Sequence, residues 1–66
     1  MQIEALRKIR GLTQAELAKR IGVDQTAVHM WEAGKTTPRL PHLKLLAREL
    51  DCSLDDLVSP AANESN

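Results

Sequence analysis

Aromatic residues, cysteine and long apolar runs are nearly absent from this sequence. It has no Phe or Tyr, and it has one Trp, Trp31, and one Cys, Cys52, among 66 residues. A single cysteine cannot form a disulfide within the chain, and no apolar run approaches the roughly 20 residues that span a bilayer or forms a signal-peptide core. These absences exclude a disulfide-stabilised scaffold and a membrane-spanning chain, and they predict a cytoplasmic location.

Strand signals are also missing, because no run alternates β-branched or aromatic residues with polar ones. The hydrophobic residues, 42% of the chain, are almost all Leu, Ile, Val and Ala, which suits small, closely packed helices. A chain of this length buries only about 60% of its unfolded surface and has room for one domain. We predict an all-α domain over residues 1–59 and a flexible polar tail over residues 60–66.

The charges are unevenly distributed although their sum is zero. Residues 1–48 contain nine Lys or Arg and four Asp or Glu, whereas residues 49–66 contain five acidic residues and no basic one. We therefore expect a basic face on the first part, able to meet a polyanion, and an acidic end turned away from it.

Apolar spacing and capping residues predict five short helices. The first, over residues 2–10, packs through Ile3, Leu6 and Ile9. Thr13 and Glu16 have the spacing of a capping box for a second helix over residues 14–21, which ends at Gly22.

Asp24 is placed to cap a third helix, over residues 25–33, whose apolar side is Val28 and Trp31. A fourth helix ends near residue 50 and has a stripe formed by Leu40, Leu43, Leu46, Ala47 and Leu50. Ser53 caps a last short helix that packs through Leu54, Leu57 and Val58.

The second and third helices, joined by a glycine turn, have a helix-turn-helix layout. Apolar residues occupy the positions where these helices share a core: Leu17, Ala18, Ile21, Val23, Val28 and Trp31. The segments LRKIRGLTQAELA, WEAGK with the later Pro38, and LDCSLDDL resemble the lambda-repressor and Cro-like (XRE-type) helix-turn-helix family. The resemblance covers roughly residues 3–58 and implies a compact five-helix DNA-binding domain.

The resemblance implies that the N-terminal part of the helix over residues 25–33 enters the major groove of DNA. Gln25 can form paired hydrogen bonds with adenine, Thr26 can offer a hydroxyl or methyl group, and an exposed Met30 can contact a thymine methyl. His29 is expected to contact a base or a phosphate. The alternative is a solvated helix face, which is the better expectation for an arbitrary amphipathic helix.

Phosphate contacts are expected from the elements beside this helix. Gln14, at the start of the second helix, can donate its backbone and side-chain N–H groups, as the resemblance implies. The loop after the third helix supplies further donors: Lys35, Thr36, Thr37 and Arg39. For Lys35 and Arg39 the alternative role is solubility alone.

The resemblance also implies a structural ion pair between Arg7 and Glu32, the alternative being two unrelated surface charges. No enzyme, metal site or cofactor is expected. His29, His42 and Cys52 lie on different elements without the short ligand spacing of a zinc site, and no strained nucleophile turn is present.

We therefore expect a sequence-specific transcription regulator that binds double-stranded DNA, a repressor acting as a homodimer on a palindromic operator. Candidates for the dimer interface are Leu54, Leu57, Val58 and the tail, although the two leucines can equally close the core. Two alternatives stay open. One is an antitoxin that represses its own operon and binds a toxin, and the other is a protein-interaction module that kept the fold without DNA binding.

Overall fold

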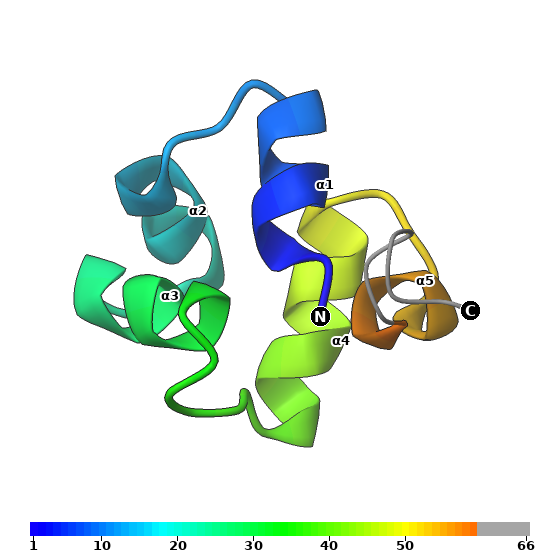
Figure 1. The fold of residues 1–66 in the computed structure, drawn as a ribbon. Coiled ribbons are helices and arrows are strands. Elements are labelled where there is room, and N and C mark those ends of the chain that lie inside the picture. The colour runs from blue at the N-terminus through cyan, green and yellow to red at the C-terminus, as the bar shows by residue number, and fades with distance from the viewer. Residues whose placement is uncertain (60–66) are drawn as a thin grey trace.

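The computed structural model describes residues 1–59 and forms five helices (Figure 1). In chain order they are α1 (Ile3–Ile9), α2 (Gln14–Ile21), α3 (Gln25–Glu32), α4 (Leu40–Glu49) and α5 (Leu54–Val58). No strand occurs in this part of the chain. The predicted all-α class is confirmed, and the predicted helix bounds differ by at most one residue at either end. The predicted tail, residues 60–66, lies outside the described residues.

The helices enclose one apolar core. In Figure 1, α2 and α3 lie on the left, α5 lies on the right, and α1 and α4 lie between them, with α4 below α1. Helix α2 packs against both α3 and α4, α1 packs against α3, and α5 packs against α4. The buried apolar residues are Ile3, Leu17, Ala18, Ile21, Val28, Trp31, Leu46, Ala47, Leu50 and Leu57. Every helix therefore contributes to the core. Separately, no helix within residues 1–59 has the length and apolar character needed to cross a membrane.

Local capping explains why α2 begins where it does. The Thr13 hydroxyl accepts a hydrogen bond from the Glu16 backbone N–H at 3.0 Å, and the Thr13 N–H donates to the Glu16 carboxylate at 2.8 Å. The predicted capping box is thus confirmed. The same backbone and side-chain hydrogen bonds with Thr13 lower the pKa of Glu16.

The turn between α2 and α3 depends on Gly22. Its φ of 79° lies in the left-handed region, which glycine adopts without steric cost. The Gly22 and Val23 N–H groups both donate to the Ala18 carbonyl, which closes the end of α2. Asp24 is the N-cap of α3 as predicted, but its side chain accepts no capping hydrogen bond. The predicted N-cap position is therefore confirmed, without the side-chain hydrogen bond that an N-cap aspartate commonly accepts.

Several residues expected in the core are exposed. Ile9 is 71% exposed, and Arg7 is buried on α1 in its place. A helix turns 100° per residue, so a strict spacing of three drifts around the axis, whereas residues 3 and 7 lie nearly on one line. Leu40, at the outer end of α4, is also exposed.

Helix α5 departs further from expectation. Leu57 is fully buried, but Leu54 is 37% exposed and Val58 is 45% exposed. The helix has five residues, fewer than two turns, so only a narrow side of it faces the core. Two of the three predicted packing residues therefore form an apolar surface.

Candidate nucleic-acid interface

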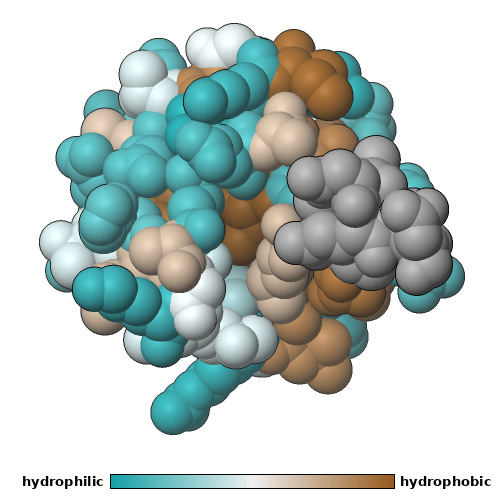
Figure 2. Space-filling view, viewed as in Figure 1, coloured by the Kyte–Doolittle hydropathy of each residue, from teal (hydrophilic) through white to brown (hydrophobic). Residues whose placement is uncertain are grey.

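The two sides of α3 carry different chemistry. Val28 and Trp31 are buried against the core, whereas Gln25, Thr26 and His29 are exposed. The side chains of Gln25 and Thr26 form no hydrogen bond with another part of residues 1–59. Their donors and acceptors consequently face solvent at the start of the helix. Figure 2 shows hydrophilic side chains covering much of the side where α2 and α3 lie.

Met30 does not have the full exposure that was expected of it. It is half-buried and lines an open hollow of about 680 Å³ together with Val23, Ala27 and Trp31. Thr26 and Thr36 line the same hollow, so the structure brings a predicted base contact and a predicted phosphate contact to the hollow that Met30 lines. The residues that line the hollow come from the turn, α3 and the following loop.

The loop after α3 is anchored at both ends. The Lys35 N–H donates to the Met30 carbonyl at 3.0 Å, and the Thr36 N–H approaches the same oxygen at 3.5 Å. Pro38 is buried, and Arg39 is the N-cap residue of α4. The four predicted phosphate donors of this loop are all exposed: Lys35, Thr36, Thr37 and Arg39.

The exposed basic residues differ in whether they have an acidic partner. Arg20 pairs with Glu49 at 3.4 Å, and Arg10 pairs with Asp51 at 3.5 Å and donates to the Leu50 carbonyl. Within residues 1–59, Lys35 and Arg39 take part in no ion pair. Glu49 and Asp51 therefore pair with arginines on α2 and at the end of α1, whereas Lys35 and Arg39 beside α3 stay without an ion pair in this part of the chain, as do Lys19, Lys44 and Arg48.

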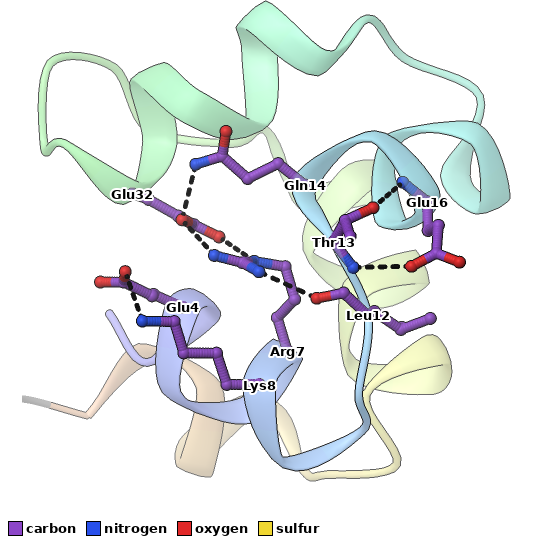
Figure 3. Close-up of polar contacts among 8 residues, drawn as sticks. All are labelled: Glu4, Arg7, Lys8, Leu12, Thr13, Gln14, Glu16 and Glu32. Carbon is purple, nitrogen blue, oxygen red and sulfur yellow. Dashed lines mark hydrogen bonds and ion pairs between the residues drawn. The ribbon is translucent and has the colours of Figure 1, made fainter.

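The predicted ion pair between Arg7 and Glu32 is present in the structure (Figure 3). Arg7 Nε donates to Glu32 Oε2 at 2.7 Å, and Arg7 Nη2 donates to Glu32 Oε1 at 3.1 Å. The two side chains are only 9% and 5% exposed. Arg7 Nη1 also donates to the Leu12 carbonyl at 2.8 Å. A bidentate pair of this kind fixes both position and angle between α1 and α3.

The ion pair shifts the pKa of both partners. The hydrogen bond from Arg7 to Glu32 raises the pKa of the Arg7 guanidinium. Burial favours a higher pKa for Glu32, but the hydrogen bonds from Arg7 and Gln14 outweigh it and leave the pKa of this carboxyl lowered. Both groups are therefore charged at neutral pH.

Gln14 has a partner that the sequence did not reveal. Its side-chain Nε2 donates to Glu32 Oε1 at 2.9 Å, so a residue expected at the DNA backbone also contacts the ion pair. Gln14, His29 and Glu32 line a second hollow of about 200 Å³. No periodicity or capping pattern links residues 18 positions apart on different helices, so no local signal indicated this contact.

The remaining candidate ligands lie apart from one another. Within residues 1–59 no group of three or more His, Cys, Asp or Glu side chains could hold a metal ion. The His42 ring lies 5.6 Å from the Trp31 ring, which is a packing contact between α4 and α3. Burial is the main cause that raises the pKa of the Cys52 thiol, and a raised pKa disfavours the reactive thiolate.

Comparisons with known proteins agree with this geometry. A family model described as helix-turn-helix matches residues 3–57. The chain is 35% identical over 65 residues to Repressor protein C2 of Salmonella phage P22, covering 98% of this chain and 30% of that protein. It is 34% identical over 58 residues to the HTH-type transcriptional activator BcrR of Enterococcus faecalis, covering 88% and 28%.

A third relative is Antitoxin HigA1 of Mycobacterium tuberculosis, which is 46% identical over 50 residues, covering 76% of this chain and 34% of that protein. The chain thus spans about a third of the length of each of these relatives. No solved structure gives a significant match.

Proposed function

Because the chain belongs to the helix-turn-helix family, we propose that it is a sequence-specific, duplex-DNA-binding regulator of transcription that acts as a repressor. The observation that carries the proposal is α3, which buries Val28 and Trp31 and exposes Gln25, Thr26 and His29. A helix presented in this way fits the major groove and can place its first turn against base edges. Occupancy of the operator would then exclude polymerase.

The exposed side chains have complementary tasks in this proposal. Gln25, the first residue of α3, forms paired hydrogen bonds with an adenine edge, and Thr26 adds a hydroxyl or methyl contact. Met30 presents its half-buried thioether to a thymine methyl from inside the hollow that it shares with Thr26. His29 contacts a base or the adjacent phosphate.

Phosphate contacts come from both sides of α3. Gln14 begins α2, where the positive end of the helix dipole favours an anion. Lys35, Thr36, Thr37 and Arg39 form the second set of donors, in a loop that contains no acidic residue. These contacts supply affinity that depends on salt, and they set the register of α3 in the groove.

The proposal includes a homodimer on a palindromic operator with half-sites about 34 Å apart, one turn of DNA. Leu54 and Val58 form its interface, because they are apolar and exposed on α5. Leu57 belongs to the core instead, since it is fully buried.

An antitoxin is the second candidate function, and the identity to Antitoxin HigA1 favours it. An antitoxin of this kind would bind its own operator through α3 and a toxin through another surface. Copurification of a second protein from the native host, together with operator binding, would favour this candidate over a repressor without a partner. Stable protein binding in the absence of any DNA binding would instead indicate an interaction module.

Selection from a random duplex pool tests the main proposal. At physiological salt the purified chain should enrich one palindromic sequence. Gln25→Ala should change the enriched sequence, because a base contact is lost. Gln14→Ala is the matched control, since loss of a phosphate contact lowers affinity and leaves the sequence preference intact. Failure to enrich any sequence, with only weak salt-sensitive binding, would contradict the proposal.

A further inference from the structure

The side chain of Gln14 is oriented before any ligand binds. A carboxylate accepts hydrogen bonds and donates none, so the amide of Gln14 must turn its NH2 group toward Glu32. One N–H is used in the 2.9 Å contact with Glu32 Oε1. The second N–H of the same nitrogen then has a defined direction at the start of α2.

The acceptor that orients Gln14 is itself immobilised. Arg7 contacts both oxygens of Glu32, and the Leu12 carbonyl holds the far side of the guanidinium. In Figure 3 these contacts form one continuous chain from the segment before α2, through α1 and α3, back to Gln14. Glu32 is therefore a rigid support for a side chain that is placed toward the surface.

The Gln14 contact adds to hydrogen bonds that Glu32 already has. Arg7 supplies a donor to each oxygen of Glu32, and the Gln14 amide adds a third hydrogen bond, which also helps to lower the pKa of this carboxyl. Thr13 and Glu16 already cap α2. The consequence of the contact is the orientation of the Gln14 amide.

We propose that Glu32, held by Arg7, is a positioning residue for DNA binding, because it fixes Gln14 with its second N–H directed at a backbone phosphate. The inference deepens the proposed function and rests on it. A free Gln side chain loses rotamer freedom when it binds, which opposes association. In this chain the Gln14 side chain loses its rotamer freedom when the protein folds. The contact with a phosphate therefore forms without a further loss of side-chain entropy.

A double-mutant cycle on DNA affinity tests the positioning. R7M/E32L replaces the buried pair with apolar residues, a change that often preserves stability. The probe is a mixed-sequence duplex at low salt, because a phosphate contact is independent of sequence. Gln14→Ala should weaken binding about tenfold in the wild-type background and less than about twofold in R7M/E32L.

A rescue variant separates positioning from general structural damage. R7M/E32Q carries no buried charge, yet it restores an amide oxygen as an acceptor for Gln14. In that background Gln14→Ala should again weaken DNA binding by most of the tenfold factor expected in the wild-type background. An equal loss in all three backgrounds would overturn the inference and leave the proposed function standing. If the wild-type chain binds no duplex at all, both are overturned.

A measurement on the wild-type chain alone guards against variants that do not fold. In the absence of DNA, NMR relaxation should give the Gln14 side-chain NH2 an order parameter close to that of rigid backbone, about 0.85. Gln25 is the matched control, because its side chain is exposed and has no partner within residues 1–59. A Gln14 amide as mobile as that of Gln25 would overturn the inference.

Discussion

Helices α3 and α5 expose different kinds of surface. Helix α3 buries Val28 and Trp31 and exposes polar side chains, whereas α5 buries Leu57 and exposes the apolar Leu54 and Val58 beside Asp55 and Asp56. In Figure 2 the apolar colours gather mainly on the side of α4 and α5, away from the more hydrophilic side of α2 and α3. A polar exposed face suits a hydrated, polar ligand such as DNA, and an apolar one suits another protein surface. One small fold therefore offers two different binding chemistries at separate helices.

The largest expected effect concerns the buried ion pair between Arg7 and Glu32. Replacing Glu32 alone with Leu leaves Arg7 charged and buried, which should cost about 3 to 5 kcal/mol of unfolding free energy. This is a large part of the about 5 to 15 kcal/mol that stabilises a typical domain. The measurement is chemical denaturation of E32L, R7M and R7M/E32L. The double variant should recover most of the loss, and a coupling near zero would contradict the structural role of the pair.

The second prediction compares two leucines on α5. Leu57→Ala removes a fully buried side chain and should cost about 2 to 5 kcal/mol. Leu54→Ala, at a position that is already 37% exposed, should cost less than about 1 kcal/mol. Thermal and urea unfolding of both variants provide the test. Equal losses of unfolding free energy would show that Leu54 packs in the core as firmly as Leu57. Leu54 would then not be part of an exposed apolar surface on α5, and the contrast with α3 would no longer hold.

The third prediction concerns the apolar surface of α5. Leu54→Lys with Val58→Lys should weaken binding to the selected palindrome about tenfold, because each half-site then binds a monomer. The sequence preference should stay unchanged. Light scattering across concentrations should show a dimer on DNA for the wild-type chain and a monomer for the variant. A monomeric mass for the wild-type chain, both free and bound, would contradict the dimer.

The bounds of α2 and the exposed side of α3 could be predicted from the sequence because their signals are local. The Thr13 and Glu16 spacing and the Gly22 turn involve neighbouring residues, and the bounds of α2 follow from them. The exposed side of α3 follows likewise from the spacing of Val28 and Trp31. The ion pair was expected only through the family resemblance, since Arg7 and Glu32 are 25 positions apart.

The features that escaped prediction depend on which side of a helix faces the core and on how the helices meet. Ile9 and Val58 match an apolar stripe by type, but the turn of 100° per residue carries Ile9 away from the line of Ile3 and Arg7, and the five residues of α5 turn only a narrow side to the core. The Gln14 contact with Glu32 requires the packed arrangement of α2 against α3. Periodicity contains no information on such a tertiary hydrogen bond.

The smallest expected effect is the dependence of stability on pH. It distinguishes the titration of Glu32, in the ion pair with Arg7, from that of the other carboxyl groups of the chain. The pKa of Glu32 is lowered from its ordinary value of 4.5. A carboxyl with a depressed pKa stabilises the fold above its unfolded pKa, and this stabilisation is lost as the pH falls through the folded pKa. The unfolding free energy of the wild-type chain should therefore decrease more steeply below about pH 4.5 than that of R7M/E32L, which keeps every other carboxyl, including Glu16. Urea denaturation of both proteins across the acidic range makes the comparison. Parallel curves would mean that Glu32 titrates alike in the folded and unfolded chain, and the ion pair would then be too weak to fix either α3 or Gln14.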